Sequence, residues 1–364
     1  MPSLPIDERV AKPRVHVLYE HDVYGNPHGS AYIRLLHPLA HEVFRDAIEV
    51  SAGRDVPMDD GTQVVIVDRL WHGWGYAGAI DFLFEQKARQ GFALIHALDD
   101  DLYRLDAEGD SAYPVDQVRR LSRGADCVVV TTEPLARRAG HYNPNVRVIR
   151  NGVDPDLFSG QRPEGDADKR TLGYMGTFTH LDDMRMVLEP LRRFLGRQAG
   201  KWTLDLVGVG ARAELKALFP QAHTRVLAPP DGAHYPDFIR WWAANCRWDM
   251  AIAPLRDTPF TRAKSDLKYL DYTMLGCPGI YSAHQAYRET VRENVNGLLA
   301  TEQTDDWFAQ LQRMAKDESL RERLLRAARD DVLTHRQVRH VASAWVTTVL
   351  DVITSTVDSD NLAH

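Results

Sequence analysis

Cysteine, long apolar runs and excess positive charge are all scarce in this sequence. Its 364 residues include three cysteines, Cys127, Cys246 and Cys277, which are odd in number and widely spaced. This spacing fits neither a disulfide framework nor a metal-binding cysteine pair. No apolar run approaches the about 20 residues that a membrane-spanning helix needs. The polar N-terminal segment also lacks the apolar stretch of a signal peptide. We therefore expect a cytoplasmic protein.

The charge balance argues against a nucleic-acid partner. The formal net charge is -7, which provides no positive surface for a phosphate backbone. A local basic cluster at Arg119, Arg120 and Arg123 leaves peripheral membrane contact open, although such clusters more commonly form a solvated helix face. The sequence signatures of serine hydrolases, zinc proteases and P-loop nucleotidases are also missing, which leaves acyl transfer, zinc hydrolysis and triphosphate cleavage without support.

What the sequence does contain is an alternation of strand-like and helix-like segments. Short apolar runs, each followed by a turn and an amphipathic stretch, occur at 14–20, 63–69, 91–98, 125–132 and 146–151. The pattern then restarts, with runs at 171–177, 202–210, 247–255 and 278–282. This alternation predicts parallel sheets covered by helices on both faces. The segment 151–170, rich in Gly, Pro and Asp, is expected to be a hinge between two Rossmann-like domains, with ligands binding beyond the carboxyl ends of the strands.

The C-terminal part is expected to be helical from about residue 305. Its last segment carries an apolar stripe at three- and four-residue spacing, formed by Val338, Val341, Trp345, Val349 and Val352. A stripe of this kind needs a surface to cover. The residues after it are expected to form a frayed tail.

Four segments together resemble retaining glycosyltransferases of the GT-B fold, specifically the family-4-like group known as glycosyltransferase group 1. They are VRVIRNGVDPDLF (146–158), LGYMGTFTHLDDM (172–184), LDLVGVG (204–210) and AIAPLRDTPFTRAKSDLKYLDYTMLGCPGIYS (251–282). The resemblance implies an α/β protein with two Rossmann-like domains, a deep interdomain cleft and a C-terminal helix that crosses back to the N-terminal domain. The implied division is an acceptor-binding domain at 1–152, a nucleotide-sugar donor domain at 153–336, and the returning helix with its tail at 337–364.

The resemblance also implies an activity. Such enzymes transfer a sugar from a UDP- or GDP-sugar to an acceptor, with retention of configuration, and the acceptor is a glycan, a lipid, a small molecule or a protein. The leaving phosphate helps to deprotonate the acceptor, so neither a metal ion nor a cofactor is expected, and the nucleotide sugar is a substrate. Two alternatives stay open: an epimerase or hydrolase of sugar nucleotides with the same fold, and a non-catalytic scaffold that binds sugar nucleotides.

The candidate donor site lies in the second half of the chain. Backbone N–H groups at turns that follow strands hold diphosphates well, and Gly176, Thr177, Gly208 and Gly210 stand at two such turns. The sharpest signal is a charged group expected on a helix near 264–276, formed by Lys264, Ser265, Lys268 and Asp271, in which the two lysines and Asp271 share a face. There Asp271 would accept the ribose hydroxyls and the lysines would neutralise the leaving diphosphate. The alternative is an ordinary ladder of salt bridges.

This segment departs from the family pattern in two ways. The family carries two glutamates separated by seven residues; Asp271 matches the second, whereas the first falls on Ala263. The Arg and Lys that follow the first glycine turn in the family are replaced by Thr179, His180 and Asp182. Our hypothesis is that Lys264, with Lys268, takes over their charge as a catalytic group.

The first half offers two further groups of candidates. Asp99, Asp100 and Asp101 end a strand, so Asp99 and Asp100 could orient or deprotonate an acceptor; a metal site formed by Asp99 and Asp101, or simple helix capping, are the alternatives. The loop after the first strand carries the second group, a proposed contact for an acceptor or a phosphate formed by Gly25, His28, Gly29 and Ser30. The aromatic residues of WHGWGY (71–76) either stack on a sugar or pack an interface.

Overall fold

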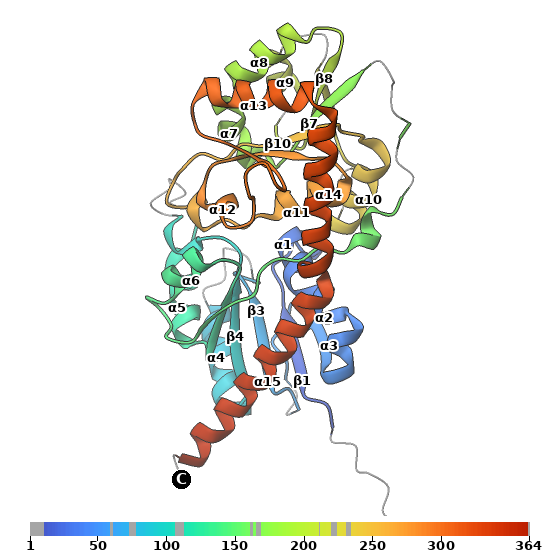
Figure 1. Cartoon of the computed structure of the whole chain (residues 1–364). Coiled ribbons are helices and arrows are strands. Elements are labelled where there is room, and N and C mark those ends of the chain that lie inside the picture. The colour runs from blue at the N-terminus through green and yellow to red at the C-terminus, as the bar shows by residue number, and fades with distance from the viewer. Residues whose placement is uncertain are drawn as a thin grey trace, which may run out of the picture.

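The computed structural model shows two lobes stacked one above the other, each built around a parallel sheet (Figure 1). It describes residues 11–58, 61–72, 78–105, 113–160, 163–164, 169–210, 212–219, 224–230 and 234–362. None of the helices within these ranges is long and apolar enough to cross a membrane.

The first lobe contains a six-stranded parallel sheet in the order β2-β1-β3-β4-β5-β6. Its strands are β1 (Arg14–Leu18), β2 (Glu49–Gly53), β3 (Val64–Asp68), β4 (Ala93–Leu98), β5 (Cys127–Val130) and β6 (Val146–Val148). The helices of this lobe are α1 (Gly29–Ala31), a π-helical turn (Tyr32–Leu36), α2 (His37–Ala40), α3 (Glu42–Ala47), α4 (Gly78–Gln90), a 3-10 turn (Leu102–Arg104), α5 (Val115–Gly124) and α6 (Glu133–Ala139).

The second lobe repeats this design with the order β12-β11-β10-β7-β8-β9. Its strands are β7 (Arg170–Met175), β8 (Trp202–Val207), β9 (Thr224–Leu227), β10 (Met250–Ala253), β11 (Gly279–Ser282) and β12 (Leu298–Ala300). Its helices are 3-10 turns at Pro155–Phe158, Phe178–His180 and Thr261–Ala263, with α7 (Leu181–Met186), α8 (Leu188–Arg197), α9 (Arg212–Leu218), α10 (Tyr235–Asn245), α11 (Leu267–Leu275), α12 (Gln285–Arg288), α13 (Thr304–Lys316) and α14 (Glu318–His335).

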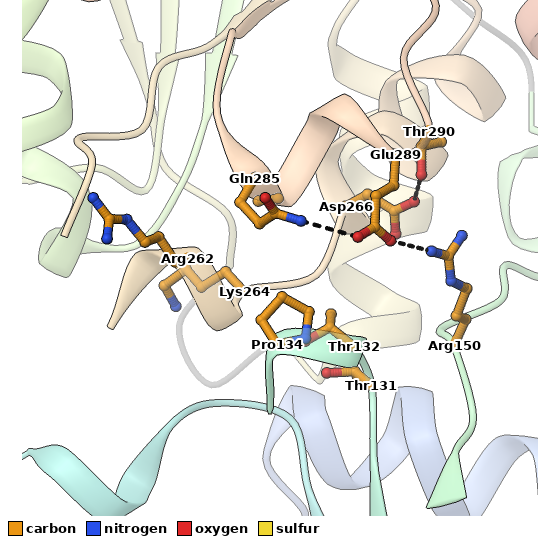
Figure 2. Close-up of a pocket in the computed structure, with 11 residues that line it drawn as sticks. Thr131, Thr132, Pro134, Arg150, Arg262, Lys264, Asp266, Gln285, Glu289 and Thr290 are labelled. Atoms are coloured by element: carbon orange, nitrogen blue, oxygen red, sulfur yellow. Dashed lines mark hydrogen bonds and ion pairs between the residues drawn. The ribbon is translucent and has the colours of Figure 1, made fainter. Parts of the chain in front are cut away.

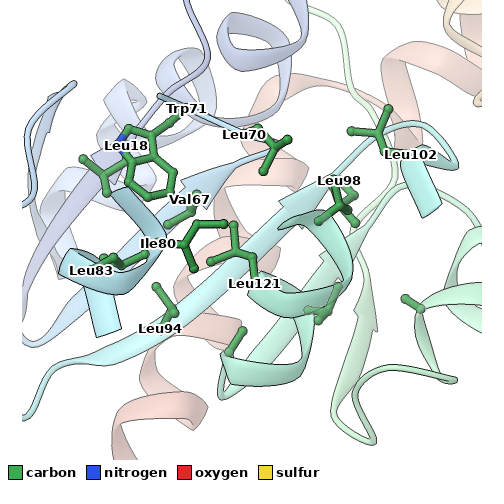
Figure 3. Close-up of a cluster of buried hydrophobic side chains, with 14 of the residues drawn as sticks. Leu18, Val67, Leu70, Trp71, Ile80, Leu83, Leu94, Leu98, Leu102 and Leu121 are labelled. Atoms are coloured by element: carbon green, nitrogen blue, oxygen red, sulfur yellow. The ribbon is translucent and has the colours of Figure 1, made fainter. Parts of the chain in front are cut away.

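Helices cover both faces of each sheet, which explains why the central strands are apolar throughout. In β3, Val65 and Val67 point into the core beneath α4 and α5, whereas Val64 and Ile66 point into the core on the opposite face. Figure 3 shows the first of these cores, where Ile80 packs near Val67. Successive strand residues face opposite sides, so a strand buried on both faces reads as a continuous apolar run.

The last helix, α15 (Val338–Leu362), leaves the second lobe and packs on the first (Figure 1). Val341, Trp345, Val349 and Val352 belong to the first-lobe core that also contains α2 and α3, and the indole N–H of Trp345 donates to the carbonyl of Arg34 at 3.0 Å. The predicted fold, including the returning helix that carries the apolar stripe, is therefore confirmed. The predicted domain boundaries at 152 and 336 stay predictions.

Candidate functional site

The carboxyl ends of the two sheets face each other, and the chain order reverses next to β7 and β10 in the second lobe. Beyond these two strands lie the turn at Gly176 and Thr177 and the loop that follows Pro254. Reversal points of this kind are where open parallel sheets bind ligands. The candidate site is therefore expected at this edge of the second sheet.

The two glycine turns of the second lobe touch each other. Gly208 has a φ of +72°, and a Cβ atom placed there would lie 2.5 Å from the carbonyl oxygen of Gly176. Only glycine satisfies both conditions. Gly210 has no such restriction, since the nearest atom to a Cβ there is 3.7 Å away. Gly176 is buried, whereas Thr177 is exposed and its hydroxyl lies 2.7 Å from that of Thr179.

A correction concerns the segment 261–271, where the helix begins later than predicted. α11 starts at Leu267, so Lys264 lies in the loop before it, and only Lys268 and Asp271 share a helix face. The loop still brings Lys264 to the site, because its ammonium donates to both carboxylate oxygens of Asp100 in the first lobe, at 3.0 and 3.2 Å. Burial raises the pKa of Asp100, but Lys264 and Arg69 together outweigh it and hold the pKa of that carboxyl below its usual value.

A basic cluster, defined here as His180, Lys264 and Lys268, lies at this edge. Burial, followed by the positive charges of Lys268 and Lys264, lowers the pKa of His180. Burial and the neighbouring Lys264 also lower the pKa of Lys268 to about 8. Two ammonium groups and a neighbouring imidazole, held together in this way, form a site ready for an anion. The Nδ1–H of His180 donates to the carboxylate of Asp183 at 2.7 Å. His180 was noted in the sequence only as a replacement, and its spacing from Gly176 was the available signal.

Asp271 is buried, with an exposed fraction of 1%. Burial raises the pKa of its carboxyl to about 7, against the opposing effects of Tyr235 and Lys268. The hydroxyl of Tyr235 donates to Asp271 at 3.0 Å, and the Tyr235 ring lies 5.9 Å from that of Tyr32 in the first lobe. Tyr235 was missed by the sequence reasoning, because an isolated aromatic residue at the start of a helix carries no signal. No ladder of salt bridges connects Lys264, Lys268 and Asp271 among the described ion pairs.

The three aspartates at the end of β4 have different partners. The carboxylate of Asp99 lies 3.3 Å from Nε of Arg69, and that of Asp101 lies 3.4 Å from Nε of Arg138. Asp99 and Asp101 are thus each engaged by an arginine, and no group of three or more metal-ligating side chains is found in the described parts of the chain. Asp101 stands at the start of the 3-10 turn, where its side chain makes no capping hydrogen bond.

The loop 24–30 is divided between two environments. Gly25, with a φ of +88°, lies beside Arg54 at the end of β2. Gly29 is exposed and lies near Tyr235, so this part of the loop reaches the second lobe. His28 is exposed, and the hydroxyl of Ser30 is buried with no hydrogen-bond partner among the described residues.

Three further residues considered in the sequence are Trp71, Ala263 and Ser265. Trp71 is buried in the first-lobe core, so packing is its role, while residues 73–77 lie outside the described residues. Ala263, at the position of the family's first glutamate, is also part of the first-lobe core, and its carbonyl accepts from the hydroxyl of Thr132 at 2.8 Å. A carboxylate has no place there, which explains this departure from the family pattern. Ser265 accepts from the side-chain amide of Asn151 at 3.0 Å.

A small pocket lies between the lobes beside Lys264 (Figure 2). The first lobe contributes Thr131, Thr132 and Arg150, and the second contributes Glu289 among others. Arg150 donates to Glu289 at 2.6 Å across the interface. This ion pair joins the two lobes at the pocket.

Comparison with known proteins identifies the type of fold. Residues 169–317 match the family model described as Glycosyl transferases group 1. Sucrose-phosphate synthase from Thermosynechococcus elongatus aligns with a TM-score of 0.59 and 18% identity, over 81% of this chain and 75% of that chain. A search among functionally curated proteins finds no match.

Two further solved structures align over nearly their whole length. HepE from Anabaena, solved in complex with UDP, has a TM-score of 0.65 and 15% identity, over 93% of this chain and 100% of that chain. A glycosyltransferase from Rickettsia africae has a TM-score of 0.64 and 11% identity, over 94% of this chain and 99% of that chain. The chain has the GT-B fold, and the predicted resemblance to group 1 glycosyltransferases is confirmed.

Proposed function

We propose that this chain is a glycosyltransferase that moves a sugar from a UDP- or GDP-sugar to an acceptor hydroxyl, with retention of configuration. The observation that carries the proposal is the juxtaposition of the basic cluster and the buried Asp271 at the reversal point of the second sheet, facing Asp99 and Asp100 of the first lobe. The match of residues 169–317 to group 1 glycosyl transferases supports it. HepE, a structural neighbour, is solved with UDP-glucose, which makes UDP the first nucleotide to test.

Each part of a nucleotide sugar has a counterpart in this proposal. The carboxylate of Asp271 accepts the ribose hydroxyls once Tyr235 moves aside, and the basic cluster and the turn at Gly176 and Thr177 hold the diphosphate. In the reaction, the bond between the sugar C1 and the phosphate oxygen breaks and its electron pair stays with the phosphate. The acceptor oxygen bonds to C1, and its proton passes to the leaving phosphate. Asp99, which Arg69 holds in place, orients the acceptor hydroxyl.

The charge that develops on the leaving diphosphate is met by Lys264 and Lys268 in this scheme, with the imidazole of His180 beside them. Fixed charges aimed at the group where charge develops are among the largest contributions to catalysis. We therefore propose that the reaction needs no divalent cation. Full activity in the presence of a chelator is the expected result, and activity that depends on added Mg²⁺ or Mn²⁺ would contradict this part.

One observation favours a second candidate, a scaffold that binds a sugar nucleotide without turning it over. Ala263 is buried in the first lobe where the family carries a glutamate. Release of UDP from UDP-glucose and of GDP from GDP-mannose, measured with and without hydroxyl acceptors, separates the possibilities. Release that needs an acceptor supports the transferase. Binding without release supports the scaffold, and release without any acceptor supports an epimerase or hydrolase.

A further inference from the structure

The two places where the chain crosses between the lobes lie side by side and are hydrogen-bonded to each other. The N–H of Val153 donates to the carbonyl of Arg336 at 2.8 Å, and the N–H of Val338 donates to the carbonyl of Val153 at 3.0 Å. Val153 and Gln337 thereby form a parallel bridge. The linker and the junction of α14 with α15 thus behave as one two-stranded unit.

Gly152 allows these crossings to approach so closely. A Cβ atom at this position would lie 2.6 Å from Val341 Cγ2 and 3.0 Å from the carbonyl oxygens of Arg336 and Gln337. Backbone atoms cannot give way as a flexible side chain can, so a larger residue would force the crossings apart. The two crossings form the pivot about which any movement of one lobe relative to the other must take place.

The side chain of Arg336 reaches from this pivot to residues 263–266, which precede α11 and are called the donor loop here. Its guanidinium donates to both carboxylate oxygens of Asp266 at 2.8 Å, and its Nε donates to the carbonyl of Asn151 at 3.0 Å. Both side chains are almost buried, with exposed fractions of 10% and 8%. The hydroxyl of Thr290 also donates to Asp266, at 2.6 Å. A bidentate ion pair of this kind fixes the orientation of the two side chains as well as the distance between them.

Asp266 stands two residues after Lys264 and directly before α11. The loop between them is also held at Ser265, whose hydroxyl accepts from Asn151 at the pivot. By contrast, Ala263 and Lys264 contact Thr132 and Asp100, which belong to the body of the first lobe. A rotation of the lobes about the pivot would break the outer contacts at 263 and 264 and leave the inner contacts at 265 and 266 in place.

We propose that Arg336 is a positioning residue, which anchors Asp266 at the pivot so that the loop delivers Lys264 to the same place in the donor site each time the lobes close. This inference depends on the proposed function, because it assigns Lys264 to the donor. It requires that Arg336 act on the ligand only through the loop. The energetic effect of a change at Arg336 must then depend on whether Lys264 is present.

The test is a double-mutant cycle on UDP affinity, measured by calorimetry with the full chain. Arg336→Lys keeps the charge but loses the bidentate ion pair with Asp266, and we expect the Kd for UDP to rise about three- to thirtyfold. In a Lys264→Ala background the same substitution should change the Kd by less than about twofold. Equal effects of Arg336→Lys in both backgrounds would show that Arg336 acts by general stability alone, which overturns the inference.

The matched control is Arg321→Lys, which changes another nearly buried arginine of α14. Arg321 donates to the carbonyls of Met314 and Ala315 and has no route to the donor loop. It should lower the melting temperature without changing UDP affinity; an equal loss of affinity in this variant would also overturn the inference.

Should Arg336→Lys fail to fold, Asn151→Ala is the alternative variant. It releases Ser265 alone, without leaving a buried charge unpaired, and is expected to show the same dependence on Lys264. Failure of the unchanged protein to bind either UDP or GDP would instead contradict the proposed function.

Discussion

Lys264 and Asp271 each hold a protein group that resembles part of the proposed donor. The carboxylate of Asp100 gives Lys264 the negative charge that a phosphate would supply, and the hydroxyl of Tyr235 gives Asp271 the hydrogen bond that a ribose would supply. A buried charge without a partner is costly, so these internal partners stabilise the site while it is empty. Donor binding must replace both of them.

Removing one internal partner should therefore strengthen donor binding. Asp100→Asn leaves Lys264 without a competing carboxylate, and the Kd for UDP should fall about two- to tenfold. The control is Glu289→Gln, which breaks another ion pair between the lobes, that of Glu289 with Arg150. A gain in affinity from both substitutions would mean that loosening the interface, rather than freeing Lys264, is responsible.

Proton binding at the same edge predicts a bell-shaped dependence of UDP affinity on pH. Asp271, whose pKa burial raises to about 7, must lose its proton to accept ribose hydroxyls well, and Lys268, whose pKa burial lowers to about 8, must keep its proton to meet a phosphate. Affinity should be highest between pH 7 and pH 8 and fall on either side. Calorimetric titrations from about pH 5.5 to pH 9.5 measure this profile. Asp271→Asn should remove only the acidic limb, and an unchanged acidic limb would exclude Asp271 from the site.

The raised pKa of Asp271 also predicts its effect on stability. Between its usual value and about 7, the folded protein keeps the Asp271 proton that the unfolded chain has lost. The contribution of this group to the free energy of unfolding therefore falls as the pH rises through that window, and the full cost is present above it. Asp271→Asn should raise the melting temperature at pH 8 more than at pH 4. A rise of equal size at both values would show that titration of Asp271 is not the cause.

At the scale of elements, the sequence was informative wherever an element is buried on both faces or serves a turn. The continuous apolar run of β3 and the stripe of α15 predicted their own environments. The hinge predicted at 151–170 stays a prediction, and residues 161–162 and 165–168 of it lie outside the described residues. The short edge strand β2 was not predicted, because Glu49–Gly53 is largely exposed and lacks an apolar run. Edge strands such as β9 and β12 depend on pairing with a neighbour, which leaves little trace in their own composition.

The start of α11 shows a second limit of the sequence at this scale. Lys264 has helical spacing to Lys268 and Asp271, yet the tertiary partners Asp100, Asn151 and Arg336 hold Lys264, Ser265 and Asp266 in a loop. Periodicity cannot reveal such partners, because they lie more than a hundred residues away from Lys264 and Ser265 in the chain and 70 residues away from Asp266. The start of α11 could therefore not be predicted from the spacing of its charged residues.

The paired glycine turns provide a prediction about elements. In Gly208→Ala the alanine would have to adopt a positive φ, and its Cβ would lie 2.5 Å from the carbonyl oxygen of Gly176. The substitution should therefore cost about 1–3 kcal/mol of stability and displace the turn at Gly176 and Thr177. UDP affinity should fall with it. Gly210→Ala is the matched control, since it meets nothing closer than 3.7 Å and should behave like the unchanged protein. Melting temperature and UDP titration measure both effects, and equal behaviour of the two variants would contradict the role given to Gly208.

At the scale of the whole molecule, each lobe is built around its own apolar cores, and several polar contacts join the lobes. Ala263 is one of the few second-lobe side chains in a first-lobe core, while α15 adds the last part of the chain to the first lobe. Polar interfaces between domains stabilise their arrangement weakly. We therefore expect the lobes to unfold as two separate units, although the chain passes between them twice.

Calorimetry of two tryptophan variants tests this expectation. Trp345 is fully buried in the first-lobe core and Trp307 is fully buried in the second. Replacing either by Ala removes a large apolar side chain and should cost about 3–5 kcal/mol. Trp345→Ala should lower one thermal transition and Trp307→Ala the other, and UDP should raise the transition that Trp307→Ala lowers, because a ligand stabilises the unit that binds it. If each variant instead lowers a single transition that contains the whole heat of unfolding, the lobes form one cooperative unit, and closure about the pivot would have to proceed without independent lobes.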